Sequence, residues 1–164
     1  CVLDFSEWII KYNLSNVKNL LYTGDSDPEL EYLNAKNKKL ITYDFSTNKN
    51  DLHTLSLGDQ KFDFVLFSQT LEHLYNPIIA LKNLWSCMEH GGHIFTSVPV
   101  INIPHMTPIH FWGINKIGLT LLFDSAGFKI LEVGEWDYRE LMKDGKIVNE
   151  EMSASQCWIL AKKI

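Results

Sequence analysis

The sequence is poor in the residues that build covalently linked or metal-stabilised folds. It contains three cysteines, Cys1, Cys87 and Cys157, and no CxxC pair. An odd number without such spacing argues against a disulfide framework or a zinc knuckle, so we expect a reducing compartment and a cytoplasmic location. No set of ligands has a recognisable metal-binding spacing, so we also expect no metal. Cys87 and Cys157 fall in apolar patterns that are typical of core positions.

Long apolar runs and an excess of positive charge are absent as well. No stretch approaches the ~18 apolar residues of a membrane span, and nothing resembles a signal peptide, so we expect no membrane partner. The formal net charge is −5, which argues against nucleic acid as a partner, because unspecific binding needs a basic surface. The densest lysine cluster, at 36–39, is typical of a solvated helix end.

The length and the lack of repeats or linkers predict one domain. The 164 residues are enough for a single sizeable core. We therefore expect one domain over 1–164, with an N-terminal helical segment over 1–16. In that segment Phe5, Trp8 and Tyr12 recur at helical spacing, and they either pack on the core or lie over a pocket as a lid.

Apolar periodicity alternates between strand and helix along the chain. Short apolar runs predict strands at 17–23, 40–43, 62–67, 93–98, 128–133 and 156–161. Capping residues and glycines predict helices over 4–13, from Asp27-Pro28 into the lysine cluster, from Asn76-Pro77 to Gly91-Gly92, and from Asn115 to Gly127. Asp144-Gly145 predicts a hairpin turn between the last two strands of the sheet.

Such alternation predicts an α/β fold. We expect a Rossmann-like three-layer αβα sandwich, whose mostly parallel sheet carries an antiparallel C-terminal hairpin strand. Open sheets of this kind bind ligands where a strand ends and a helix begins. The segment over 51–74, DLHTLSLGDQKFDFVLFSQTLEHL, has that character, because its buried run Phe64–Phe67 stops abruptly in polar residues.

In this order and spacing the chain resembles class I S-adenosylmethionine-dependent methyltransferases, in the methyltransferase type 11-like group. The resemblance runs from about Val17 to the end. It rests on four pieces: FDFVLFSQTLEHL followed by a helix, GG and a strand; Asp44 closing LITYDF; DLHTL upstream; and the L…AGF pattern over 119–128. It implies S-adenosylmethionine as the cofactor and methyl transfer to an O or N atom of a small molecule.

The resemblance implies roles for two acidic residues. Asp44 stands where the family holds the ribose, and a carboxylate there would accept charge-assisted hydrogen bonds from both hydroxyls. Asp51 would accept from the adenine amino group, while the backbone N–H of Leu52 would donate to a ring nitrogen. A turn-capping aspartate and a loop aspartate facing water are the structural alternatives.

Four further residues are expected to contact the cofactor. Gly24 would let the backbone approach it at the first strand-to-helix turn. Ser68 and Gln69 would lie beside the sulfonium and its methyl group, and His73 would contact the cofactor or cap its helix. An ordinary turn glycine and ordinary loop polar residues are the alternatives.

The loop after strand 93–98 would cover the methyl acceptor. His105 and His110 are the candidate catalytic bases, because histidine titrates near neutral pH. A structural histidine bonded to a loop carbonyl is the alternative. Met106, Phe111 and Trp112 would either form an apolar acceptor pocket or anchor the loop on the core.

The chain departs from the family pattern at the first glycine motif. The family has an acidic residue and then G-x-G-x-G, whereas residues 22–27 read YTGDSD and keep only Gly24. Asp44 and Asp51 are also too close for a full crossover helix between them. These departures favour one alternative, a catalytically inactive methyltransferase-like scaffold. A nicotinamide-dependent dehydrogenase is disfavoured, because no G-x-G-x-x-G follows the first strand.

Overall fold

The computed structural model describes residues 2–24, 28–42, 49–100, 110–135, 142–143, 146–147 and 156–164. The strands are β1 (Asn19–Tyr22), β2 (Asn37–Leu40), β3 (Phe62–Leu66), β4 (Met88–Pro99), β5 (Phe128–Glu135), β6 (Met142–Lys143), β7 (Lys146–Ile147) and β8 (Gln156–Lys163). The helices are α1 (Val2–Lys11), α2 (Pro77–Cys87) and α3 (Lys116–Ser125), with short 3-10 helices η1 (Leu14–Asn16), η2 (Pro28–Glu31) and η3 (Leu71–His73).

Six strands form one sheet in the order β2-β1-β3-β4-β8-β5. The pairs β1–β2, β1–β3 and β3–β4 are parallel. Strand β8 runs antiparallel between β4 and β5. The α/β prediction of a mostly parallel sheet with an antiparallel C-terminal hairpin strand is therefore confirmed.

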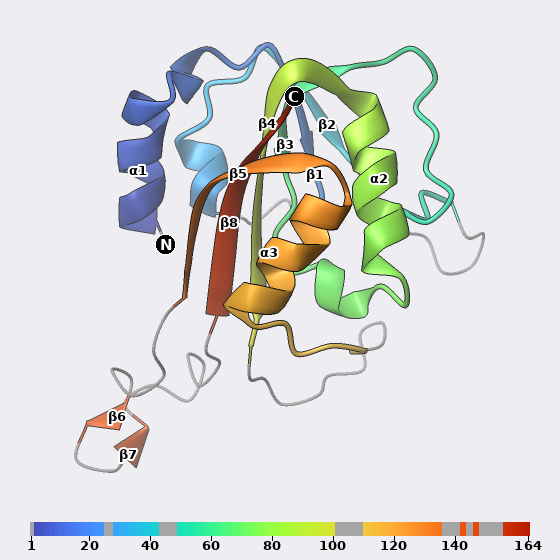
Figure 1. Ribbon diagram of the computed structural model, residues 1–164. Helices are drawn as coiled ribbons and strands as arrows, with labels where there is room; N and C mark the ends of the chain where they lie inside the picture. The colour runs from blue at the N-terminus through green and yellow to red at the C-terminus, as the bar shows by residue number, and fades with distance from the viewer. Residues whose placement is uncertain are drawn as a thin grey trace.

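Helices cover both faces of the sheet and bury two apolar clusters (Figure 1). Helices α2 and α3 pack on one face, and α1 lies on the other with η2. Phe5 of α1 is fully buried, and its ring packs edge-to-face on Phe64 and Phe95, with centroids 6.3 and 5.1 Å away. Trp8 is buried beside it. These two side chains are thus core residues and do not form a lid.

Asparagine caps begin both α2 and α3, as the sequence predicts. The Asn76 side chain accepts a hydrogen bond from the backbone N–H of Ile79, and Asn115 accepts one from Gly118. Gly127 ends α3 with φ +93°, a left-handed conformation that glycine adopts without strain. The capping residues therefore predict correctly where these two helices begin, next to the edge of the sheet that is expected to bind a ligand.

The lysine cluster is a strand and not a helix end. Strand β2 occupies Asn37–Leu40, earlier than the predicted strand 40–43, and among the described strands it pairs with β1 alone. Exposed lysines on an edge strand discourage pairing with another chain. The helix predicted after Asp27-Pro28 is reduced to the single 3-10 turn η2, with Leu33 buried after it.

Gly91-Gly92 do not end α2, which stops at Cys87 and leads directly into β4. A Cβ on Gly92 would lie 3.0–3.2 Å from the carbonyl oxygens of Glu89, Phe62 and Asp63. The β3–β4 pairing is irregular at this point, between Phe62 and Phe64. A close approach of two strands, rather than a helix stop, therefore requires a glycine here.

The predicted turn Asp144-Gly145 lies outside the described residues, although the strands flanking it, β6 and β7, pair antiparallel. Cys87 and Cys157 are both buried, as expected of core cysteines. None of the helices in the described part of the chain has the length and apolar character needed to cross a bilayer.

Candidate functional site

The carboxyl ends of β1, β3 and β4 meet at one edge of the sheet. The chain after β3 stays joined to β4, because the backbone N–H of Gln69 donates to the Ser97 carbonyl at 2.8 Å. The chain after β1 stays joined to β3, because the N–H of Thr23 donates to the Leu66 carbonyl at 3.3 Å. The structure therefore brings the predicted residues Gly24, Ser68 and Gln69 to this same edge.

A pair of threonines bridges the ends of β1 and β3. The hydroxyl of Thr70 donates to the Ser68 carbonyl at 2.8 Å and lies 3.1 Å from the hydroxyl of Thr23. Because the single proton of Thr70 is already used, Thr23 is the donor in the second bond. The bridge holds the loop after β3 against Gly24, the residue predicted to let a ligand approach.

Ser68 and Gln69 differ in their surroundings. Ser68 is buried, and its hydroxyl has no hydrogen-bond partner among the described residues. Gln69 is exposed, its side chain donates to the Ser97 hydroxyl at 3.2 Å, and its φ of +48° is unusual for a residue with a side chain. Left-handed non-glycine residues and unpaired buried hydroxyls both gather at functional sites.

Asp51 is tied to His53 in a compact turn. One carboxylate oxygen, Oδ1, accepts hydrogen bonds from the backbone N–H of His53 at 2.9 Å and from its ring Nδ1 at 2.6 Å. Burial alone would raise the pKa of Asp51, but these bonds from His53 outweigh it and lower that pKa. Both bonds use Oδ1, so the predicted adenine contact would fall to Oδ2.

His53 connects this turn to the start of α2. Its Nε2 accepts a hydrogen bond from the Asn76 N–H at 3.2 Å, which assigns the ring proton to Nδ1. The ring stacks on Tyr75 with centroids 3.8 Å apart and an angle of 13°. Leu52, predicted to face the adenine, is buried, and its carbonyl accepts from the Asn83 side chain at 2.9 Å. The DLH turn is thus rigidly docked on α2.

Glu72 is the buried carboxylate of the site. Its side chain is 1% exposed, and Oε2 has no hydrogen-bond partner among the described residues. Burial raises the pKa of Glu72 to about 7, offset in part by its own backbone N–H. A carboxylate in such surroundings exchanges a proton near neutral pH, which is the range that acid–base chemistry uses.

Two histidines lie next to this carboxylate. Nε2 of His73 is 3.7 Å from Oε1 of Glu72, and the His73 ring meets the His110 ring edge-on with centroids 5.9 Å apart. The backbone holds this group together, because the Glu72 carbonyl accepts from the N–H of Phe111 at 2.7 Å and of Trp112 at 3.3 Å. Three titratable side chains from two separate segments therefore meet at the sheet edge.

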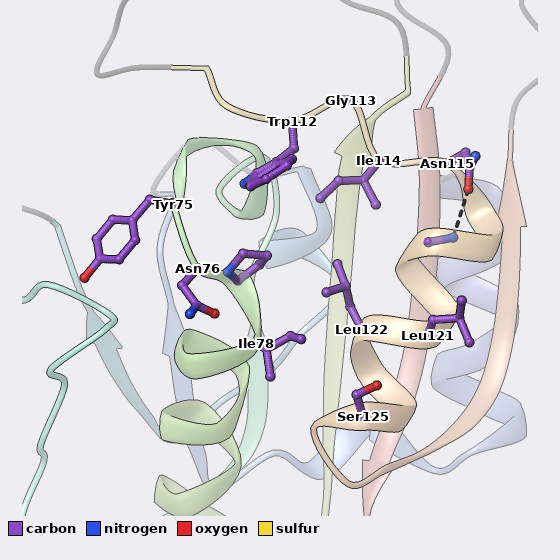
Figure 2. A pocket seen from close by; sticks show the side chains of 12 residues that line it. Tyr75, Asn76, Ile78, Trp112, Gly113, Ile114, Asn115, Leu121, Leu122 and Ser125 are labelled. Carbon is purple, nitrogen blue, oxygen red and sulfur yellow. Dashed lines mark hydrogen bonds between the residues drawn. The ribbon is translucent and has the colours of Figure 1, made fainter.

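An open groove of about 540 Å³ runs between α2 and α3 (Figure 2). Trp112 and Ile114 lie across one end, and Ile78 and Leu122 approach one another from the two helices. Trp112 is fixed there, because its indole N–H donates to the Leu74 carbonyl at 2.7 Å. None of the predicted cofactor residues lines the groove. Its lining comes from the start of α2, from α3 and from the segment that leads into α3.

Two predicted residues lie outside the described part of the chain. These are Asp44, assigned to the ribose, and His105, one of the two catalytic candidates. His110, the other candidate, is partly buried beside His73. Within the described ranges no group of three histidine, cysteine or acidic residues has a geometry suited to a metal ion.

Two residues of the site escaped the sequence analysis. Glu72 belongs to the LEHL segment but had no assigned role, because nothing local distinguishes a buried glutamate from an exposed one. His53 had no role either, although an aspartate two residues before a histidine is a recognisable signal for a side-chain-to-backbone turn. The burial of Glu72 depends on packing against residues far away in the sequence, whereas the turn between Asp51 and His53 can be predicted from the local sequence.

Solved structures with the same fold include several methyltransferases. The [4+2]-cyclase SpnF superposes with a TM-score of 0.67 at 14% identity, over 99% of this chain and 80% of that one. The 1,6-didemethyltoxoflavin-N1-methyltransferase of Burkholderia thailandensis gives 0.66 at 12%, over 99% and 77%. The N-methyltransferase NodS of Bradyrhizobium japonicum, in complex with S-adenosyl-L-homocysteine, gives 0.61 at 14%, over 98% and 86%.

No curated protein sequence matches the chain significantly. A family model described as a methyltransferase domain matches residues 18–133, from the residue before β1 into β5. That stretch includes every described residue that the sequence analysis assigned to the cofactor, and it covers more than half of the 164 residues. The chain therefore belongs to the methyltransferase domain family, and it has the fold of class I S-adenosylmethionine-dependent methyltransferases such as NodS.

Proposed function

We propose that the protein transfers a methyl group from S-adenosylmethionine to an O or N atom of a small molecule. The observation that carries this proposal is the match of residues 18–133 to a methyltransferase domain. The edge within that match holds a buried unpaired hydroxyl, a buried carboxylate and two histidines. Binding groups and acid–base groups in one place are what such a reaction needs.

The side chains at the edge fit this cofactor. S-adenosylmethionine carries a sulfonium and an ammonium group, so it favours neutral or acidic surroundings. The described residues Thr23, Ser68 and Gln69 are neutral, and Asp51 and Glu72 are acidic. Ser68 offers a buried hydroxyl with no hydrogen-bond partner among the described residues, the kind of group that a polar ligand satisfies.

The bound cofactor supplies an activated methyl group on sulfur, and the protein supplies position. Asp44 would hold the ribose hydroxyls, and Asp51 with the Leu52 N–H would hold the adenine. Gly24 would leave space for the backbone to approach. Positioning of this kind lowers the barrier by several kcal/mol, up to about 7–11 in model reactions.

The remaining residues act on the acceptor side. Ser68, Gln69 and His73 would border the methyl group, and His110 or His105 would take the proton that an O or N acceptor loses. The contact between the His110 and His73 rings supports this role, because His73 in turn lies 3.7 Å from the Glu72 carboxylate. A base held by a further group is a recurring catalytic arrangement.

Calorimetric titration with S-adenosylmethionine and S-adenosyl-L-homocysteine tests the proposal. We expect both to bind, and we expect Asp44→Ala to weaken them by about tenfold, since it removes charge-assisted hydrogen bonds. Lys38→Ala is the control, an exposed lysine on β2. Absence of binding at millimolar ligand would contradict the function, and unchanged affinity in Asp44→Ala would contradict the ribose assignment.

A catalytically inactive binding or scaffold domain is the second candidate. The incomplete glycine motif at 22–27 favours it. A shared fold does not decide the reaction either, since the neighbour SpnF is a cyclase. Cofactor binding without methyl transfer to any of a broad set of amines and phenols would support this candidate.

A further inference from the structure

The groove between α2 and α3 has no role in the proposed function so far, because none of the residues assigned to the cofactor lines it. Its lining is mostly apolar, with Ile78 on one helix and Leu122 on the other facing across it and Trp112 over one end (Figure 2). None of the described residues that line it carries a charge. Its volume of about 540 Å³ falls in the range of small-molecule sites.

The groove is joined to the candidate site on both sides of the end where Trp112 lies (Figure 2). Trp112 donates its backbone N–H to the Glu72 carbonyl, so this wall is fixed to the carboxylate and histidine group. Tyr75, on the other side, stacks on His53, which is bonded to Asp51. A ligand lying in the groove would therefore end between the predicted adenine contact and the histidines.

The lining of the groove favours an uncharged ligand, because none of its described residues carries a charge that could pair with one. Helices α2 and α3 both begin at the end where Trp112 lies, and helix N-termini attract anions. Here Asn76 and Asn115 already engage a backbone N–H at each of these ends, at 3.3 and 2.8 Å. Leu121 lines the groove and is 60% exposed, so apolar surface is left for a ligand to cover.

We propose that this groove binds the uncharged apolar portion of the methyl acceptor and directs its nucleophilic atom to the sheet edge at Glu72, His73 and His110. The proposal rests on the proposed function and adds the chemical class of the acceptor to it. A neutral molecule with an aromatic or alkyl body and one terminal hydroxyl or amine fits the lining.

The test uses 2-naphthol as a neutral probe and 2-naphthoate as its charged counterpart, each titrated into the full chain by fluorescence. We expect 2-naphthol to bind and 2-naphthoate to bind at least fivefold more weakly. Leu121→Asp should weaken 2-naphthol about tenfold, since it places a charge against an apolar ligand. Ile117→Asp is the matched control on α3, because Ile117 is 71% exposed and does not line the groove; we expect less than twofold change.

A second pair of variants, on α2, keeps the proposal testable if a variant of the α3 pair fails to fold. Ile78 lines the groove and its neighbour Ile79 does not. A carboxylate in the first turn of a helix is tolerated by the helix dipole, so Ile78→Asp and Ile79→Asp should both fold. Only Ile78→Asp should lose 2-naphthol, and both should keep their affinity for S-adenosyl-L-homocysteine.

Four results would overturn the proposal. These are no binding of 2-naphthol, equal binding of both probes, equal losses in lining and control variants, and self-association of the wild type that Leu121→Asp abolishes, which would assign the groove to a second copy. Binding of 2-naphthol without any binding of S-adenosylmethionine would instead overturn the acceptor role together with the proposed function, and would leave the groove as a site for neutral ligands.

Discussion

The carboxylate oxygen Oε1 of Glu72 lies 3.7 Å from Nε2 of His73, and the Glu72 side chain is 1% exposed. Burying a charged carboxylate costs desolvation free energy. That cost falls when the carboxylate holds a proton or lies next to a positive charge. Its neighbour His73 becomes such a charge on protonation, and a cationic ligand would supply another. We therefore expect a cationic ligand at the sheet edge to bind more tightly when Glu72 is deprotonated.

Glu72 makes the stability of the protein depend on pH. Its pKa is about 7 in the folded chain, against 4.5 ordinarily. Between these values the folded chain binds more protons at Glu72 than the unfolded chain does, so the free energy of unfolding falls as pH rises. Glu72→Gln should remove this loss, which amounts to roughly 2–4 kcal/mol between pH 4.5 and pH 8.

Urea unfolding of the wild type and Glu72→Gln across this pH range measures the difference. Other groups titrate in the same window, so only the change relative to wild type is informative. Glu7→Gln is the control, because Glu7 is exposed on α1. Parallel stability curves for the wild type and Glu72→Gln would show that Glu72 keeps an ordinary pKa.

His53 should stabilise the start of α2. His53→Ala removes the stacking on Tyr75 and leaves the Asn76 N–H without its acceptor. Loss of a buried hydrogen bond and an aromatic contact should cost about 1–3 kcal/mol in the free energy of unfolding. The exposed His90→Ala is the control and should change it by less than ~0.5 kcal/mol. Equal stabilities of these two variants would refute a structural role for His53.

Gly92 leaves little room for a side chain. A Cβ there would lie 3.0–3.2 Å from three carbonyl oxygens in the backbone of β3 and β4, which cannot turn aside as a side chain does. We expect Gly92→Ala to lower the free energy of unfolding by about 1–3 kcal/mol. Gly118→Ala is the control, because its Cβ would meet only side-chain atoms at 3.5 Å or more. A thermal melt of Gly92→Ala that matches the wild type would contradict this reading of the β3–β4 contact.

The same glycine illustrates what the sequence could and could not predict. Five of the six strand runs, the asparagine caps of α2 and α3 and the terminal antiparallel strand follow from local patterns, and the structure confirms them. Gly91-Gly92 looked like a helix stop because glycine ends helices in many proteins. Its true cause, the approach of β3 to β4, is a contact between distant residues that no local pattern contains.

The lysine cluster was wrongly predicted, and Glu72 received no role, for a related reason. Whether exposed lysines belong to a helix end or to an edge strand depends on the neighbour, and here that neighbour is β1. The burial of Glu72 depends on the segment that follows β4, whose Phe111 and Trp112 N–H groups bind its carbonyl. Local chemistry thus identified the sheet edge, while the buried acid within it required the tertiary structure.

Substitution of His110 should lower the rate of methyl transfer and leave cofactor affinity unchanged. If His110 takes the acceptor proton, His110→Ala should lower kcat by about 10²–10⁴-fold, because it removes a general base. Affinity for S-adenosyl-L-homocysteine should stay within twofold, because the predicted cofactor contacts at Asp44 and Asp51 are untouched. The control is again His90→Ala, which should change neither quantity.

The pH profile of kcat adds a readout that a packing defect would not produce, since the ascending limb should vanish in His110→Ala. A parallel loss of kcat and of cofactor affinity would mean instead that His110 holds the edge together through its contact with His73, and the base would then be sought at His105.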